Sequence, residues 1–346
     1  MKVLSLFDGI SCGMVALERA GIKVEKYSAF EIDKYAITIA YKNYPWIEHC
    51  GNVFNADFAK FQGYDLLLGG SPCTYWSVAK KERETTCDGE GFKLFMEYVR
   101  ALHESKCKYF LYENNDSIHQ NIKDEISKQL GVKPIMINSA LLSAQQRKRC
   151  YWTNIPNVTQ PKDKGILLKD IIESGLPWQD KSYCMTSTYS GAIFKNTLER
   201  KQRTMLAEPV ILQRSHGFNK GGVKHNKCPT ITANGSFECN NFVAEPIRIG
   251  QYGRNGQGQR IYSVRGKSVT LSANGGGLGA QTGLYKIDLP DGNYIIRKLT
   301  PIEAERLQTL SDNYTEGISA TQRYKCIGNG WTVDVIAHIL MGLKEV

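Results

Sequence analysis

The cysteine in the segment GGSPCTYWS, residues 69–77, is the side chain best suited to covalent chemistry in this sequence. Cys73 follows a proline directly after the apolar run YDLLLGG, so we expect it on a loop at the end of a buried strand. Positive charge nearby lowers the pKa of a cysteine below its usual value of about 8.5 and favours the nucleophilic thiolate. Arg147 and Arg149, in the segment QQRKRCYW, can supply that charge.

A carboxyl group is expected at the same edge of the fold. Glu113 lies in LYENND, at the end of another predicted strand. In a partly desolvated site such an acid can stay protonated and donate a hydrogen bond. The structural alternatives are a helix N-terminal carboxylate for Glu113 and a solvated face for the two arginines. Cys73, Glu113, Arg147 and Arg149 are therefore the candidate catalytic residues.

The amino-terminal segment predicts a nucleotide-binding loop between a strand and a helix. Phe7, Gly9 and Gly13 lie in the turn, and Glu31 ends the next strand roughly 20 residues later, where an acid can bind ribose hydroxyls. Ser11 stands where close approach to a pyrophosphate requires glycine, so the GxGxxG pattern is absent. A cofactor with adenosine but no pyrophosphate fits this loop better, and a purely structural turn is the alternative.

The elements that must position these residues alternate along the first half of the chain. Successive strands joined by helices predict right-handed crossovers and a doubly wound, mostly parallel α/β sheet buried on both faces. Ligands gather at the carboxyl ends of such strands, where every candidate residue lies. The predicted strands are 2–7, 27–33, 64–70, 108–114 and 134–142, and the predicted helices are 14–20, 34–44 and 122–130.

From about residue 176 the sequence predicts a second, smaller domain of short strands and loops, rich in Gly, Asn, Thr and Ser. The segments CPTITANGS near 228 and SVTLSANGG near 268 are alike, either as related hairpins or by chance. Helical patterns return with TPIEAERLQTL and NGWTVDVIAHILMGLKEV, whose apolar face is expected to pack on the first domain. Basic residues suited to phosphate contact are Lys195, Arg200, Lys201, Arg203, Arg214, Lys220, Lys224, Lys227, Arg248, Arg254, Arg260, Arg265 and Lys267.

The composition narrows the class of protein. Of 346 residues, 42% are hydrophobic and 23% charged, which excludes disordered, collagen-like and coiled-coil classes. The sequence has 44 Lys and Arg against 34 Asp and Glu, a net charge of +10 that favours a polyanionic partner. The alternative is a basic enzyme that does not bind nucleic acid.

No apolar run reaches the roughly 18 residues of a membrane span, so we expect a cytoplasmic protein. The ten cysteines lack paired zinc-ligand spacing, which argues for a reducing compartment and no metal site.

Taken together, the motifs resemble those of the C5-cytosine DNA methyltransferases. LFDGISCG resembles the methyl-donor loop, FEID the ribose-binding acid, SPC the nucleophile loop, EN the carboxyl on the target ring and QRKR the paired arginines. RKLTPIEAERLQ and IGNG resemble the two C-terminal blocks. The resemblance covers about residues 1–175 and 296–346 and implies a Rossmann-like catalytic domain over 1–175, a target-recognition domain with hinge over 176–319, and a C-terminal helix over 320–346 that completes the catalytic domain.

The resemblance also implies a role for each candidate residue. Cys73 would add to C6 of a cytosine flipped out of double-stranded DNA, Glu113 would hold the ring at N3, and Arg149 would contact O2 with support from Arg147. S-adenosylmethionine would donate the methyl group. The implied cofactor-binding residues are Phe7, Gly9, Ser11, Glu31, Ile32, Asn52, Val53, Pro72 and Asn329.

The sequence departs from the family pattern at three places without removing a catalytic group. Ser11 and Cys12 replace two glycines of the donor loop. Asn52 replaces the aspartate that faces the adenine amino group, and an amide oxygen can still accept that bond. Asn115 replaces a valine after Glu-Asn and is expected to alter the support of Glu113.

Two other functions compete with methylation of double-stranded DNA. The same chemistry can act on cytosine in RNA, although the long second domain favours the reading of duplex base edges. A non-catalytic DNA-binding relative is disfavoured because the acting side chains are present. A nicotinamide-dependent dehydrogenase is excluded by the missing GxGxxG pattern. We expect a monomer on DNA, and the chain gives no basis for inferring a cognate restriction endonuclease.

Overall fold

The computed structural model divides the chain into two compact units, Met1–Ile166 with Cys184–Ser190 and Ala304–Val346, and Leu167–Tyr183 with Gly191–Glu303. Cys73 and the two similar segments near 228 and 268 lie outside the residues that the structure describes. The described residues are 1–72, 75–76, 83–193, 196–197, 199–213, 222–225, 248–251, 260–262 and 294–345.

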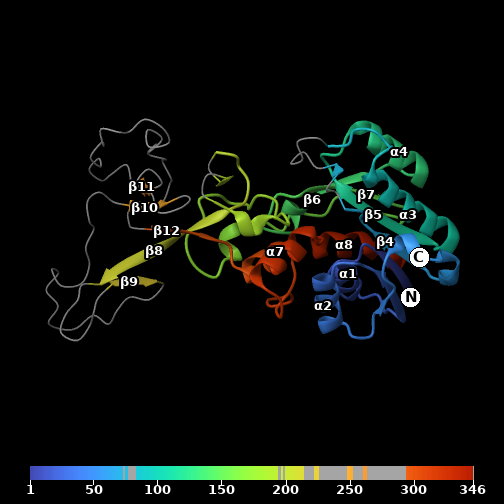
Figure 1. Ribbon diagram of the computed structural model, residues 1–346, viewed down its shortest axis with the longest axis horizontal. Coiled ribbons are helices and arrows are strands. Elements are labelled where there is room, and N and C mark those ends of the chain that lie inside the picture. Colours follow the sequence, from blue (N-terminus) through green and yellow to red (C-terminus); the bar gives the residue numbers. More distant parts are fainter. Residues whose placement is uncertain are drawn as a thin grey trace. The chain divides into compact units, whose positions relative to one another are not determined.

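A seven-stranded, mostly parallel sheet forms the centre of the first unit (Figure 1). The strand order is β3-β2-β1-β4-β5-β7-β6, and the pairs among the first five strands are parallel. This architecture confirms the predicted doubly wound α/β fold. The strands are β1 (Lys2–Leu6), β2 (Lys26–Phe30), β3 (Glu48–His49), β4 (Leu66–Gly69), β5 (Tyr109–Asn115), β6 (Ile135–Asn138) and β7 (Lys148–Thr153).

One edge of the sheet differs from the sequence prediction. The predicted fifth strand, β6, does not lie beside β5, because β7 inserts between them and runs antiparallel to both. A short connection joins β6 to β7, which suits an antiparallel pair, whereas a parallel pair needs a longer crossover. The insertion brings the amino end of β7 beside the carboxyl end of β5, with Arg149 opposite Asn115.

Helices cover both faces of this sheet (Figure 1). One face packs against α1 (Cys12–Arg19), α2 (Lys34–Asn43) and α8 (Val333–Leu340), and the other against α3 (Glu90–Ser105) and α4 (Gln120–Leu130). Side chains alternate along each strand, so that Val3 faces the first layer and Leu4 the second. The sequence analysis did not predict α3.

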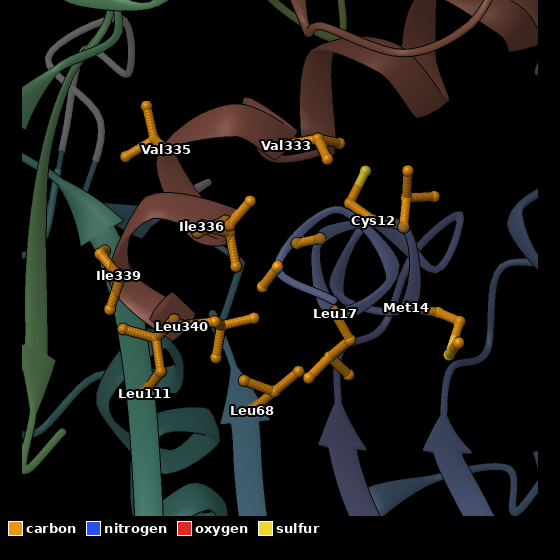
Figure 2. Close-up of a cluster of buried hydrophobic side chains, with 14 of the residues drawn as sticks. Cys12, Met14, Leu17, Leu68, Leu111, Val333, Val335, Ile336, Ile339 and Leu340 are labelled. Carbon is orange, nitrogen blue, oxygen red and sulfur yellow. The ribbon is translucent and has the colours of Figure 1, made fainter. Parts of the chain in front are cut away.

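The carboxyl-terminal helix packs into the core, as its apolar face predicts. Figure 2 shows α8 facing α1 and the strands that carry Leu68 and Leu111. The helix begins later than predicted. Asn329 is the last residue of α7 (Ala320–Asn329), and α8 begins only at Val333. The fully buried side chains of α8 are Val333, Val335, Ile336, Ile339 and Leu340.

The stretch Ala320–Lys344 is long and apolar enough to meet a composition test for a membrane span, with a mean hydropathy of 1.3. It is not one continuous helix, since α7 and α8 are separate, and 61% of its most apolar window is buried inside the protein. Its hydropathy is therefore accounted for by the core that Figure 2 shows.

The second unit contains strands of antiparallel sheet. β8 (Met205–Gln213) pairs with β12 (Tyr294–Lys298) on one side and β9 (Gly222–His225) on the other, and β10 (Arg248–Gln251) pairs with β11 (Arg260–Tyr262). Arg297 forms a bidentate ion pair with Glu303, at 2.8 Å to each carboxylate oxygen, and donates to Ser174 O at 2.6 Å. The predicted helix at TPIEAERLQTL is α6 (Pro301–Leu307).

Candidate active site

The sheet topology gathers the predicted site residues at one edge. Phe7 directly follows β1, Glu31 follows β2, Ser71 and Pro72 follow β4, and Glu113 lies near the end of β5. These strands are parallel, so their carboxyl ends meet at the same edge. The antiparallel β7 adds its amino end to that edge, together with the two arginines.

Glu113 is held by two donors from distant parts of the chain. Its side chain is 11% exposed, and its Oε1 lies 2.9 Å from Arg149 Nε in an ion pair. Its Oε2 accepts a hydrogen bond of 2.9 Å from Trp331 Nε1. Glu113 lies opposite Tyr151 and Arg149 lies opposite Asn115, so the ion pair is a diagonal pair on one face of the sheet. The carboxylate is thereby fixed in position at the strand end.

Arg147 binds main chain rather than a carboxylate. Its Nη1 donates to Met185 O at 2.9 Å, and its Nη2 donates to Gly330 O at 2.9 Å and Gly328 O at 3.3 Å. The residue is 5% exposed. Arg147 therefore ties the IGNG segment and the segment at 184–190 to the start of β7.

Cys184 lies between the two arginines. Its Sγ is 3.4 Å from Arg147 Nη1 and 3.8 Å from Arg149 Nη2. Burial raises the pKa of this thiol, but the charges and hydrogen bonds of the two guanidinium groups outweigh burial and lower that pKa below its ordinary value. A thiol with a lowered pKa thus lies beside Arg149, the ion-pair partner of Glu113.

A buried polar cluster supports the start of the SPC loop. Tyr112 and Ser71 share a hydrogen bond of 2.6 Å between their hydroxyls. Asn114 Nδ2 donates to Ser71 O and to the Tyr112 hydroxyl, each at 3.2 Å. The Asn of the EN motif therefore fixes the residue two positions before Cys73. Asn115 Oδ1 accepts from Ser117 Oγ at 2.7 Å, and its backbone lies opposite Arg149, the ion-pair partner of Glu113.

A buried carboxyl organises the loop after β1. Asp8 accepts hydrogen bonds of 2.6 Å from the hydroxyls of Ser5, Ser11 and Tyr27. Burial raises the pKa of Asp8 although all three hydrogen bonds act to lower it. Ser11 has a φ of 59°, a left-handed conformation in which glycine is ordinarily preferred. Its bond to Asp8 stabilises that conformation, which explains how serine replaces glycine here.

Glu31 connects the ends of β1 and β2. Its Oε2 accepts from Gly9 N at 2.8 Å, and its Oε1 accepts from Ile32 N at 2.7 Å and Asp33 N at 2.8 Å. Each carboxylate oxygen can accept more than one hydrogen bond, so Glu31 can still bind hydroxyls. This arrangement suits the ribose contact that the sequence predicted.

The turn after β3 is held from α3. Asn52 Oδ1 accepts from Phe54 N at 3.1 Å and begins the short 3-10 helix Val53–Asn55. Arg100 donates to Val53 O at 3.0 Å and to Ala56 O at 2.9 Å. The oxygen of Asn52 thus carries a capping bond in addition to any adenine contact.

The remaining cofactor candidates differ in exposure. Val53 is buried and Phe7 is half-buried, whereas the other three lie at the surface of the first unit. Ile32 is 72% exposed and Phe54 50% exposed, which is unusual for large apolar side chains. Pro72 and Asn329 are also exposed, Asn329 as the last residue of α7. No contact in the described residues joins Asn329 to the Glu31 cluster.

Three residues of this site were not predicted from the sequence. Trp331 follows the IGNG block directly, so its position in the motif was the available signal. Asp8 precedes Gly9 in the donor loop, where an acid three residues from both Ser5 and Ser11 is a detectable pattern. Cys184 lies at the start of the variable region, and nothing in its sequence context distinguishes it from the other cysteines.

The sequence profile of the C-5 cytosine-specific DNA methylases matches residues 1–345. The chain belongs to this family. This methylase is 26% identical over 357 residues to the type II methyltransferase M.HhaI of Haemophilus parahaemolyticus, covering 98% of this chain and 93% of that protein. It is 29% identical over 319 residues to the orphan methyltransferase M.Rho11sI of Bacillus phage rho11s, covering 84% of this chain and 61% of that protein.

Solved structures of other methyltransferases share the fold of this methylase. The Entamoeba histolytica methyltransferase EhMeth has a TM-score of 0.61 at 15% identity and covers 100% of this chain and 98% of its own. Spodoptera frugiperda DNMT2 has a TM-score of 0.60 at 15% identity, with 99% of each chain covered. At these identities the likeness concerns the fold alone. The protein is thus a C5-cytosine methyltransferase with the family's α/β fold.

Proposed function

We propose that this methylase transfers a methyl group from S-adenosylmethionine to C5 of a cytosine in double-stranded DNA, with Cys73 as the nucleophile. The observation that carries the proposal is the buried Glu113, ion-paired with Arg149 at 2.9 Å beside the start of the SPC loop. A fixed carboxyl group next to a guanidinium matches the N3 and O2 edge of cytosine.

The chemistry begins at C6 of the cytosine. The Cys73 thiolate forms an Sγ–C6 bond as the C5–C6 π bond breaks, and the electrons move toward N3, which takes a proton from the Glu113 carboxyl group. N3 returns that proton to Glu113 when the ring is restored. C5 becomes an enamine-like nucleophile and takes the methyl group. A base then removes the C5 proton as the Sγ–C6 bond breaks, which restores the ring and frees Cys73. Because C6 is inaccessible in a stacked duplex, the base must first be flipped out.

The cofactor is proposed to bind along the ends of β1, β2 and β3. When bound, S-adenosylmethionine supplies an electrophilic methyl group. Glu31 would bind the ribose hydroxyls, and the exposed Ile32 offers an apolar surface for adenine beside the turn that Asn52 begins. The remaining contacts are assigned to Phe7, Gly9, Ser11, Val53, Pro72 and Asn329.

The second unit is proposed to read the DNA sequence. The basic residues between 195 and 270 suit phosphate contact, and a strand- and loop-rich insertion suits the reading of base edges. The proposed division is a catalytic domain over 1–175 and 320–346 and a target-recognition domain with hinge over 176–319. The compact units divide the chain differently, since 184–190 and 304–319 belong to the first unit and 167–175 to the second. We propose that the protein acts as a monomer in the cytoplasm.

Transfer of radiolabelled methyl groups tests this function. Wild-type protein, Cys73→Ala and Glu113→Gln are each incubated with labelled S-adenosylmethionine and either duplex DNA of mixed sequence or RNA of matching composition. We expect label in DNA at C5 of cytosine with the wild type only. Label in RNA instead would replace the proposed substrate, and full activity of Cys73→Ala would refute the proposed nucleophile.

A further inference from the structure

The indole of Trp331 lies between the donor-loop helix and the target-base carboxyl of this methylase. Its Nε1 donates to Glu113 Oε2 at 2.9 Å. The residue before it, Gly330, lies against Cys12, the first residue of α1, since a methyl group on Gly330 would lie 3.2 Å from Cys12 Sγ. A methyl group placed on Gly13, the next residue of α1, would come within 3.6 Å of the indole ring. Trp331 is therefore in contact with both halves of the proposed active site.

The end of β4 lies directly beside this hydrogen bond. A methyl group at Gly70 would lie 3.0 Å from Glu113 Oε2 and 3.2 Å from Trp331 Nε1. Such distances are tighter than ordinary contacts, so the hydrogen bond passes close over a residue that has no side chain. The glycine before the SPC motif thus makes space for the pairing of indole and carboxylate.

The two donors to Glu113 divide its oxygens between them. Arg149 Nε binds Oε1 and Trp331 Nε1 binds Oε2, each at 2.9 Å. A carboxylate has about four acceptor positions, so two remain for a ligand. Two donors on different oxygens fix the plane of the carboxylate, which a single donor would leave free to rotate.

We infer that Trp331 is a positioning residue for the methyl transfer, acting through Glu113 by holding its carboxylate in the plane that meets N3 of the cytosine. The inference rests on the proposed function. The Trp331–Glu113 hydrogen bond should stabilise the transition state, in which charge develops on the ring. Its loss should therefore lower kcat rather than weaken the binding of DNA or cofactor. Trp331→Phe removes the N–H and keeps an aromatic ring.

A kinetic double-mutant cycle tests this inference. Trp331→Phe should lower kcat about 10- to 100-fold, as expected for a hydrogen bond to a charged group, and leave the KM for DNA within about 3-fold. In the Glu113→Ala background, Trp331→Phe should change the single-turnover rate constant of methyl transfer less than 2-fold. A factor of two in rate corresponds to about 0.4 kcal/mol in activation free energy. An equal loss in both backgrounds would overturn the inference.

Trp152→Phe is the matched control. Trp152 Nε1 donates to Ser127 Oγ at 2.9 Å in the core. Its ring packs on Tyr112 in the other layer of the core from Trp331, and its indole bonds neither Glu113 nor Arg149 among the described residues. This variant loses an indole hydrogen bond of the same length and should keep kcat within about 2-fold. A similar loss of kcat in Trp152→Phe and Trp331→Phe would mean that both act through general stability, which also overturns the inference.

The hydrogen bond itself can be observed without catalysis. The chain has five tryptophans, so indole N–H signals of 15N-labelled protein are few, and the two phenylalanine variants assign those of Trp331 and Trp152. Glu113→Ala should shift the Trp331 signal and leave that of Trp152 in place. An unmoved Trp331 signal would overturn the inference, whereas failure of the wild type to methylate any nucleic acid would overturn only the proposed function.

Discussion

Arg147 offers the sharpest test of how the site is assembled. The change Arg147→Gln removes three hydrogen bonds to main-chain oxygens, those of Met185, Gly328 and Gly330. At a net value of about 0.5–1.5 kcal/mol each, their loss should lower the free energy of unfolding by about 2–4 kcal/mol. For a domain of this size that corresponds to a melting temperature about 4–16 °C lower.

Thermal unfolding followed by circular dichroism measures this effect. Arg19→Gln is the matched control, because the Arg19–Asp334 ion pair of 2.6 Å is more exposed, at 34% and 21%, and such pairs contribute about 0–1 kcal/mol. The expected order of melting temperatures is wild type, then Arg19→Gln, then Arg147→Gln well below both. If Arg147→Gln melted with or above Arg19→Gln, the reasoning that Arg147 ties the C-terminal block to β7 would be wrong.

Three further perturbations follow from the same contacts. Gly328→Ala should lower the free energy of unfolding in urea by roughly 1–3 kcal/mol or more, because its methyl group would lie 2.2 Å from a main-chain atom. Gly191→Ala is the control and should unfold like wild type, because the nearest atom to its methyl group would be 3.6 Å away. The two arginines lower the thiol pKa of Cys184 despite its burial, whereas burial raises the pKa of the equally half-buried Cys50 to about 11. Cys184 should therefore react with iodoacetamide at a lower pH than Cys50, as measured by mass spectrometry. The reverse order would contradict the geometry. Glu31→Ala should weaken S-adenosylmethionine binding about 5- to 150-fold by calorimetry, for a loss of about 1–3 kcal/mol, and an unchanged Kd would remove Glu31 from the cofactor site.

The sequence predicts most of the sheet because its strands are apolar runs separated by helical patterns. The strands that carry Leu4, Leu67 and Leu111 were all identified, with ends within a few residues of those observed. The place of β7 could not be predicted in this way, since strand order depends on long-range pairing rather than on local pattern. The helix α3 was not predicted, although Phe92, Phe95 and Val99 follow helical spacing and are buried.

The sequence predicted those site residues that lie within recognisable motifs. Glu113 and Arg149 were predicted as site residues, and the structure brings them within 2.9 Å. Arg147 and Arg149 look equivalent in QQRKRCYW, yet one binds main chain and the other binds the carboxylate. Arg149 lies within β7 opposite Asn115 of β5, whereas Arg147 precedes the strand and donates to Met185 O and Gly330 O. Trp331 follows the IGNG motif directly, but its bond to Glu113 depends on tertiary packing, as does the position of Cys184 between the two arginines.

The central claim, covalent addition of Cys73 to the cytosine ring, is tested most directly by a duplex with 5-fluorocytosine at the target position. Fluorine cannot leave as a cation, so the final elimination is blocked once the methyl group has been transferred. With S-adenosylmethionine present, the account predicts a denaturant-stable protein–DNA adduct that maps to the peptide containing Cys73 and is absent from Cys73→Ala. No adduct on a duplex whose unfluorinated form is methylated would contradict the account.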